Sequence, residues 1–201
     1  MKNSDKRVLA VFDFDGTLTK KDTLLEFIIF ACGRWHFYAG ILLYSPVLLM
    51  MLLHILPNWK AKEMLFGHFF RGWSYRKFQS KGKDFAAIID TFRRDSVLDI
   101  LKKHIGDGHD VYVVSASIEE WVQPYCSQFH VKSVLGTKVE VDASGNLTGK
   151  FLTRNCYGME KVHRLTEAEP DREDYYLYAY GDSRGDRELI DFSDTGIYIT
   201  T

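Results

Sequence analysis

Apolar and polar positions change their spacing along the chain, and the changes divide it into three parts. Residues 8–12 form a short apolar run that ends at Asp13 and Asp15, which predicts a buried strand followed by a turn. Residues 23–94 have a helical pattern rich in aromatic side chains. From residue 96 onward, strands and helices alternate, as is typical of βαβ units around a parallel sheet. The pattern predicts an α/β fold, with a Rossmann-like parallel-sheet core and an inserted helical cap domain.

The alternating part predicts individual elements. Residues 97–105 have one apolar helical face, and Gly106 is the expected stop. Residues 111–114 read as a buried strand that ends on Ser115, and Ser117 with Glu120 fits a capping box at the start of the next helix. Residues 136–151 alternate around Ser144-Gly145-Asn146, which predicts a small β-hairpin. Two further strands are expected at 175–180 and 196–199.

Length and charge narrow the classes of protein. The chain has 201 residues and a net charge of -1, which fits one core, residues 1–22 and 95–201, with a cap at 23–94. Near-neutral charge gives no support for nucleic-acid binding, and no obligate protein partner is evident. Cys32, Cys126 and Cys156 are far apart and predict reduced thiols. The N-terminus lacks the features of a signal peptide, so we expect a cytoplasmic protein.

Three of the predicted strands end on polar residues: Asp13, Ser115 and Asp182. In open α/β sheets, ligands bind beyond the carboxyl ends of the strands, so adjacent parallel strands would bring these residues together. Each residue alone fits an ordinary loop or N-cap position. With Asp15 and Asp186 added, the set instead indicates one site.

The charges of this set need compensation. Asp13, Asp15, Asp182 and Asp186 in one small cleft would repel one another and raise each other's pKa values. A hard divalent cation with oxygen ligands removes that conflict, and Mg²⁺ favours sites shared by carboxylates and phosphate. Lys161 is either a further positive charge at this site or an ordinary solvated helix lysine.

Four segments occur in an order that resembles a known family. They are "DFDGTLT" at 13–19, "VVSAS" at 113–117, Lys161, and "GDSRGD" at 181–186. Together they resemble the four motifs of the haloacid dehalogenase-like phosphatase superfamily. The large insertion between the first two motifs is similar to that of its phosphoserine-phosphatase-like subgroup, subfamily IB.

The resemblance implies an Mg²⁺-dependent phosphatase that hydrolyses a phosphate monoester through an aspartyl-phosphate. It implies that Asp13 is the nucleophile and Asp15 the general acid and base. The implied Mg²⁺ ligands are Asp13, the backbone carbonyl of Asp15, and Asp182, with Asp186 as support. The implied phosphate-binding residues are Gly16, Thr17, Ser115, Ala116 and Lys161.

The substrate is less clear, because three positions depart from the phosphoserine phosphatase pattern. Asp22 stands where that enzyme has a glutamate that recognises the substrate amine, Gly16 replaces a serine, and Gly185 replaces an asparagine. These changes weaken a phosphoserine assignment. Asp22 fits either a substrate-binding role or an N-cap for the helix that begins at Thr23.

The insertion points to a different substrate class. Residues 35–57 contain no Asp, Glu, Lys or Arg, and their length suffices to cross a bilayer. Pro46 would kink one helix or separate two short ones. The stretch is either two buried cap helices or an interfacial or re-entrant pair at the cytoplasmic membrane face. The mixed basic and aromatic residues 58–73 fit an interface or an amphipathic cap helix equally.

The layout of this insertion is similar to that of phosphatidylglycerophosphatase C, a membrane lipid phosphatase of the same subgroup. That similarity implies a lipid-like phosphate such as phosphatidylglycerophosphate as substrate. Hydrolysis of a small metabolite, as by phosphoserine phosphatase, is the alternative. A phosphotransferase and a catalytically silent membrane-bound module are further alternatives, and the retained Asp13, Asp15, Lys161, Asp182 and Asp186 argue against the silent module.

Overall fold

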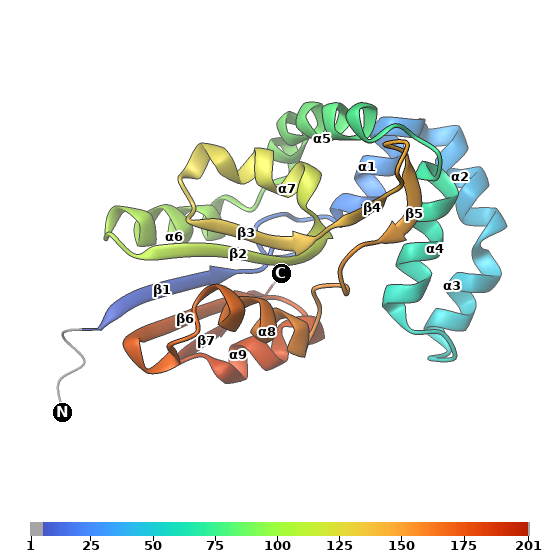
Figure 1. Cartoon of the computed structure of the whole chain (residues 1–201). Helices are drawn as coiled ribbons and strands as arrows, with labels where there is room; N and C mark the ends of the chain where they lie inside the picture. Colours follow the sequence, from blue (N-terminus) through green and yellow to red (C-terminus); the bar gives the residue numbers. More distant parts are fainter. Residues whose placement is uncertain (1–5, 201) are drawn as a thin grey trace.

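The computed structural model describes residues 6–200, and its main feature is a parallel sheet of five strands (Figure 1). The strand order is β3-β2-β1-β6-β7. Their bounds are β1 Arg7–Phe12, β2 Asp110–Ile118, β3 Ser133–Thr137, β6 Tyr175–Gly181 and β7 Thr195–Tyr198. The central strand β1 pairs in parallel with both β2 and β6. The predicted Rossmann-like sheet is therefore confirmed.

Alternation along β1 divides the core into two apolar layers. Ala10 and Phe12 belong to one buried cluster, whereas Leu9 and Val11 belong to the other, because successive side chains of a strand point to opposite faces. Helices α6 (Asp95–Gly106) and α7 (Glu119–Cys126) cover the first face. Helices α8 (Met159–Ala168) and α9 (Arg187–Phe192) cover the second. Helix α6 ends at Gly106, as predicted.

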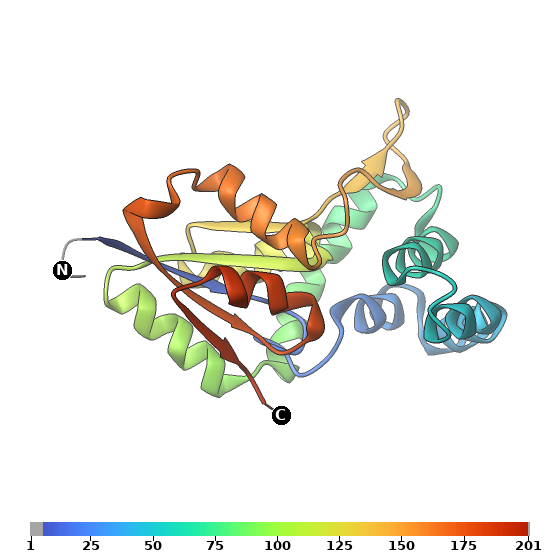
Figure 2. The same ribbon diagram turned by 90° about the horizontal axis from the view of Figure 1, so that it is seen from below.

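Five helices within residues 23–89 lie beyond the carboxyl ends of the strands (Figures 1 and 2). They are α1 Thr23–Cys32, α2 Arg34–Leu43, α3 Ser45–Leu52, α4 Asn58–Phe70 and α5 Tyr75–Ile89. The chain enters and leaves this cap through two neighbouring segments. Backbone hydrogen bonds of 2.8 Å join Lys20 to Phe92 and Arg94 to Leu18. The domain boundaries, with a core of residues 1–22 and 95–201 and a cap of residues 23–94, stay a prediction.

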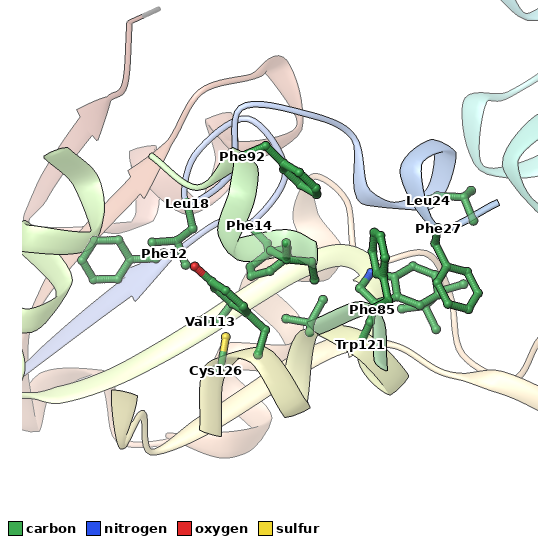
Figure 3. Packing of buried hydrophobic residues seen from close by; sticks show 14 of the residues in the cluster. Phe12, Phe14, Leu18, Leu24, Phe27, Phe85, Phe92, Val113, Trp121 and Cys126 are labelled. Atoms are coloured by element: carbon green, nitrogen blue, oxygen red, sulfur yellow. The ribbon is translucent and has the colours of Figure 1, made fainter. Parts of the chain in front are cut away.

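An aromatic cluster fixes the cap against the core (Figure 3). Phe27 of α1 stacks on Trp121 of α7 with ring centroids 4.5 Å apart, and Phe85 of α5 meets both rings. All three side chains are fully buried. Because each such ring buries about 150–250 Å², this cluster carries much of the contact that holds α1 and α5 in place over the site.

The predicted hairpin is confirmed and lies against the cap rather than the core sheet. Its antiparallel strands are β4 Val139–Val141 and β5 Leu147–Phe151. Backbone hydrogen bonds join the hairpin to the turn after α4: Gly72 donates to Leu147, and Tyr75 donates to Gly145, both at 2.8 Å. The hairpin therefore reaches from the core to form one wall with α4.

The charge-free stretch forms two exposed helices. Helices α2 and α3 meet at an angle of 60°, and Pro46 lies in the first turn of α3. Only Gly40 of α2 is buried, and no residue of α3 is, so the alternative of two buried helices is wrong. Within residues 6–200 no one helix has the length and apolar character to cross a membrane, although this bent pair meets both criteria when taken together.

Candidate active site

The turn after β1 delivers Asp13 to the centre of the sheet edge. The Asp13 backbone N–H donates to the Tyr180 carbonyl at 2.9 Å, which continues the pairing of β1 with β6. The chain then turns at Gly16, whose φ is +84°. A Cβ atom on Gly16 would lie 2.2 Å from Oδ2 of Asp182. Glycine is therefore required both for the backbone conformation and for the close approach of Asp182.

Lys161 pairs with two aspartates from different elements. It lies in the first turn of α8, and its Nζ donates to Oδ1 of Asp13 and to Oδ1 of Asp186. All three residues are buried. Burial lowers the pKa of Lys161, but the charges of Asp13 and Asp186 outweigh this effect and raise it above its usual range. The alternative of a solvated helix lysine is wrong.

Asp186 is occupied by the protein itself. Its Oδ1 accepts from Lys161, while its Oδ2 accepts from the backbone N–H groups of Asp182 and Ser183 and from the Ser183 hydroxyl. Oγ of Ser183 also accepts from the Gly185 backbone N–H at 3.2 Å. With the 3.0 Å bond from the Ser183 backbone N–H to Asp186, it forms a capping box at the start of the short helix Arg184–Asp186. This geometry suits a residue that holds Lys161 and the loop after β6 in position.

Three carboxylates gather where the sequence predicts a metal site. Oxygens of Asp13, Asp182 and Asp186 all lie within 4.8 Å of one another. Burial raises the pKa of Asp13 to about 7, even though Lys161 lowers it, and burial also raises the pKa of Asp182. A cluster of hard oxygen donors whose ionised forms are disfavoured fits a divalent cation such as Mg²⁺. Asp13, Asp182 and Asp186 would hold or support it.

Asp15 has a different environment from Asp13. Its Oδ1 accepts from the Thr23 backbone N–H at 3.1 Å and from the Thr23 hydroxyl at 2.7 Å, and its Oδ2 accepts from the Ser117 hydroxyl. Trp121 donates to the Thr23 hydroxyl in turn. Burial raises the pKa of Asp15 to about 6, and the charge of Asp22 adds to that rise. A carboxyl group with a pKa near neutrality can both donate and accept a proton.

Ser117 corrects one prediction. Strand β2 continues to Ile118, so the residue before α7 is Ile118, and α7 begins without a side-chain cap. The predicted capping box of Ser117 and Glu120 is therefore wrong. The Ser117 hydroxyl instead binds Asp15 and lies 2.9 Å from the Thr23 hydroxyl. Sequence reasoning assigned it to a helix end because Ser-x-x-Glu fits that pattern without regard to tertiary contacts.

The residues predicted to bind phosphate divide into two groups. Ser115, Ala116 and Lys161 line one cavity of about 200 Å³ together with Asp13 and Asp15. Gly16 and Thr17 are not among its lining residues, and the Thr17 hydroxyl donates to Oδ1 of Asp182 at 3.1 Å. We call this space the catalytic cavity. The remaining residues that line it are Asp22, Asn58, Lys62, Asn155, Tyr157, Ser183 and Gly185.

Asp22 is an N-cap and also lines the catalytic cavity. Its Oδ1 accepts from the Leu25 backbone N–H at 3.1 Å, as the N-cap interpretation predicts. Sequence reasoning missed Lys62, whose Nζ donates to the Ala116 carbonyl at 3.0 Å. Asn58 and Lys62 are four residues apart on α4, and that spacing puts both on one helix face.

Comparison with known proteins agrees with this fold. Residues 10–191 match the haloacid dehalogenase-like hydrolase family. The chain is 30% identical over 190 residues to protein CicA of Caulobacter vibrioides. The aligned region covers 93% of this chain and 83% of CicA. A protein of unknown function from Bordetella pertussis superposes with a TM-score of 0.82 at 22% identity, over 96% of this chain and 90% of that one.

A phosphoserine phosphatase structure that carries an analogue of the phospho-aspartyl intermediate also superposes. The TM-score is 0.64 at 19% identity, over 96% of this chain and 86% of that one. At this identity the likeness concerns the fold, and it agrees with the predicted subgroup. The extent of the match over residues 10–191 and the identity to CicA show the family itself. The chain belongs to the haloacid dehalogenase-like hydrolase family and is, at that level, a hydrolase as predicted.

Proposed function

We propose that the protein is an Mg²⁺-dependent phosphatase that hydrolyses a phosphate monoester through an aspartyl-phosphate on Asp13. The observation that carries the proposal is the arrangement of Asp13. Lys161 binds its Oδ1, whereas its Oδ2 has no hydrogen-bond partner within residues 6–200. Asp13 also lines the catalytic cavity, so one oxygen is fixed by a cation while the other is available to a substrate.

The residues around Asp13 support a two-step reaction. In the first step Oδ2 of Asp13 bonds to phosphorus, the bond from phosphorus to the ester oxygen breaks, and Asp15 gives its proton to the departing alcohol. In the second step Asp15 takes a proton from water, the water oxygen bonds to phosphorus, and the bond from phosphorus to Oδ2 of Asp13 breaks, which releases inorganic phosphate and restores the Asp13 carboxylate. Ser115 and Lys161 would bind the phosphoryl oxygens and offset their charge.

Mg²⁺ would neutralise the charge of the carboxylates and of the phosphoryl group when bound. Asp13, Asp182 and the backbone carbonyl of Asp15 are its proposed ligands. Asp186 supports the site through Lys161 and through the backbone N–H groups of Asp182 and Ser183.

A chromogenic aryl phosphate tests the proposed chemistry. The purified protein should release phosphate in Mg²⁺ and lose that activity in a chelator. Beryllofluoride, which imitates a phosphoryl group on a carboxylate, should bind only when Mg²⁺ and Asp13 are both present. Hydrolysis that proceeds at full rate in the chelator would contradict the proposed metal dependence.

We also propose that the outer face of α2 and α3 contacts a membrane and that the substrate is lipid-like. Trp35, Leu42, Leu52 and Ile55 are between 68% and 87% exposed, in a stretch without charged residues. Exposed apolar surface of this extent is uncommon on a soluble monomer and marks an interaction surface. Arg34 and Lys60 flank the stretch, and cations at those positions suit anionic headgroups. We call residues 35–57 the apolar face.

Flotation with vesicles that contain phosphatidylglycerol tests the apolar face. The wild-type protein should rise with the vesicles in high salt, and Leu42→Glu/Leu52→Glu should stay at the bottom of the gradient. Ile88→Glu is the matched control, because Ile88 is also exposed but lies on α5. If the wild-type protein stayed at the bottom, the membrane proposal would be wrong. The alternative, a phosphatase of small polar metabolites such as phosphoserine, would then be favoured.

A further inference from the structure

A second cavity adjoins the catalytic cavity. Its volume is about 800 Å³, against about 200 Å³ for the catalytic cavity. Asn58, Asn155 and Tyr157 line both. The larger cavity lies between the start of α4, the end of β5 with the segment that follows it, and the first turns of α8. Because these three residues line both cavities, the cavities are neighbours, and a molecule with its phosphate in one can place its remaining part in the other.

Several large apolar side chains that line the larger cavity are exposed to solvent rather than buried in the core. Trp59, Leu152 and Met159 line it and are 47%, 64% and 52% exposed, and Phe151 is half-buried beside them. Large apolar side chains left open to solvent next to a polar reaction centre are typical of a pocket for an apolar ligand group.

The carboxylates at the edge of this cavity already have partners. Oε1 of Glu63 binds Lys60 at 2.9 Å, and its Oε2 accepts from the Phe151 backbone N–H at 3.0 Å. Glu160 accepts from Arg164 at 3.0 Å. These groups fix α4 to β5 and stiffen α8, so both carboxylates are already engaged. The rest of the lining offers the apolar side chains to a ligand, together with the polar side chains of Thr153, Arg154 and His163.

The junction between the two cavities is polar and contains an unpaired group. Oδ1 of Asn155 is buried and has no hydrogen-bond partner within residues 6–200. A buried amide oxygen without a partner costs free energy that a ligand donor such as a hydroxyl group would recover. The junction therefore suits a molecule with a polar group between its phosphate and its apolar part.

Gly185 positions the third residue of the junction. A Cβ atom on Gly185 would lie 2.4 Å from Cε2 of Tyr157, so any side chain there would displace the Tyr157 ring. The Gly158 backbone N–H also donates to the Gly185 carbonyl at 2.9 Å. Gly185 stands where the phosphoserine-phosphatase pattern has an asparagine. The glycine thus leaves room for the Tyr157 ring, which lines both cavities at their junction.

We propose that the larger cavity, which we call the leaving-group groove, binds the apolar part of the alcohol that is released from the phosphate monoester. This inference rests on the proposed phosphatase function and names its substrate class: monoesters whose alcohol carries an alkyl or acyl chain. The ester oxygen takes the proton of Asp15 as its bond to phosphorus breaks, and the neutral alcohol remains in the groove. Pro57, the last residue of the apolar face, lines the groove together with Trp59, so the groove borders the apolar face and a chain can extend from one to the other.

A series of n-alkyl phosphates from ethyl to octyl, below their micelle concentrations and without membranes, tests the groove. Phosphate release gives kcat/KM for each ester. We expect kcat/KM to rise about two- to fourfold per methylene until the groove is filled, because each buried methylene contributes about 0.8 kcal/mol. A flat series, or phosphoserine hydrolysed as well as octyl phosphate, would overturn the proposal. Loss of hydrolysis of every ester and of the aryl phosphate would instead overturn the phosphatase assignment.

Two variants locate the effect. Leu152→Gln/Met159→Gln should lower the octyl-to-ethyl ratio of kcat/KM to near one, since both exposed side chains line the groove. The matched control, Leu49→Gln, changes an exposed leucine of α3 outside the groove and should keep the wild-type ratio. An unchanged ratio in the double variant, or the same fall in the control, would contradict the assignment. The wild-type series alone decides the proposal where the double variant does not fold.

Discussion

The catalytic cavity and the apolar face depart from the usual distribution of polar and apolar residues in opposite directions. In the first, Asp13 and Lys161 are 6% and 2% exposed, and Asp186, which binds Lys161, is 1% exposed. In the second, Leu42 and Leu52 are 76% and 68% exposed. Burying a charge and exposing an apolar side chain both cost free energy, so each region marks a place where something other than stability has kept the residues.

The two regions differ in how the cost is offset. The buried charges compensate one another within the chain, because Lys161 binds two carboxylates and Asp15 accepts three hydrogen bonds. The outer side chains of α2 and α3 have no such partner within residues 6–200, where no residue of α3 is buried. The candidate active site, whose charged residues pair with one another inside the fold, can be recognised in the sequence from its motifs. The apolar face, whose partner is only proposed, is marked in the sequence by its composition alone.

The largest expected effect is at the nucleophile. Asp13→Asn should lower hydrolysis of the aryl phosphate by about four powers of ten or more, because an amide cannot form the acyl phosphate. Lys161 keeps its bond to Asp186, so the fold should persist, and thermal unfolding checks this. A variant that unfolds at the wild-type temperature and still hydrolyses the ester at a similar rate would remove Asp13 from the reaction.

The next effect separates the two aspartates of the turn. Asp15→Asn should slow hydrolysis by about two to four powers of ten, the range for general acid–base catalysis. The loss should persist at high Mg²⁺, because the expected Mg²⁺ ligand is the backbone carbonyl of Asp15. Titration of activity with Mg²⁺ measures this.

Asp182→Ala is the contrasting variant, since it should weaken Mg²⁺ binding and recover activity as Mg²⁺ is raised. If raised Mg²⁺ restored Asp15→Asn to the same extent, the side chain of Asp15 would be a metal ligand and not the proton donor.

Much of the arrangement of the candidate site was predictable, because each motif begins where a predicted strand ends. Asp13, Ser115 and Asp182 each follow an apolar run, and parallel pairing of β1, β2 and β6 brings them to one edge. Gly16 was expected for its turn, and the structure adds its contact with Asp182. The role of Ser117 was not predictable, because its partners Asp15 and Thr23 come from other segments and no local pattern encodes that meeting.

The cap was predictable only in outline. Its helical pattern and the break at Pro46 are local properties, and α2 and α3 confirm both. Which faces would be exposed depends on how the five helices pack, so the sequence left two alternatives open for residues 35–57: buried cap helices or a pair at a membrane face. The leaving-group groove was still harder to predict from the sequence, because its lining residues Asn58, Asn155 and Tyr157 come from separate segments, α4 and the segment before α8.

Alanine substitutions at a buried and an exposed apolar residue of the cap sharpen the comparison. Phe27→Ala should lower the free energy of unfolding by about 3–5 kcal/mol, because it leaves a cavity among fully buried rings. Leu52→Ala should change it by less than about 0.5 kcal/mol, as for other surface positions. Urea denaturation measures both. A comparable loss in Leu52→Ala would mean that α3 packs against the protein and offers no free face.

The last expected effect concerns stability alone, at His104, a buried polar residue outside the four motifs. Nε2 of His104 lies 2.9 Å from the Tyr180 hydroxyl, and its Nδ1 lies 2.7 Å from Nδ1 of His109. Burial, together with the charges of His109 and Lys103, lowers the pKa of His104 to about 4, although the charge of Asp107 acts in the opposite direction. Unlike Asp13, which pairs with Lys161, His104 forms no ion pair within residues 6–200, so the fold holds it neutral at pH 7.

The sign of the resulting pH dependence follows from linkage. In the unfolded chain the pKa of His104 returns to its ordinary value near 6.5, so the unfolded state takes up a proton first as the pH falls. Its contribution to stability is present above pH 6.5 and is lost as the pH falls toward 4. We expect a loss of about 2 kcal/mol across that window. His104→Gln retains a hydrogen-bonding side chain but cannot titrate, so its free energy of unfolding should vary less with pH than that of the wild type. Parallel urea titrations from pH 7 to pH 4.5 measure the difference, and identical slopes for both proteins would show that His104 is as easily protonated in the fold as in the open chain.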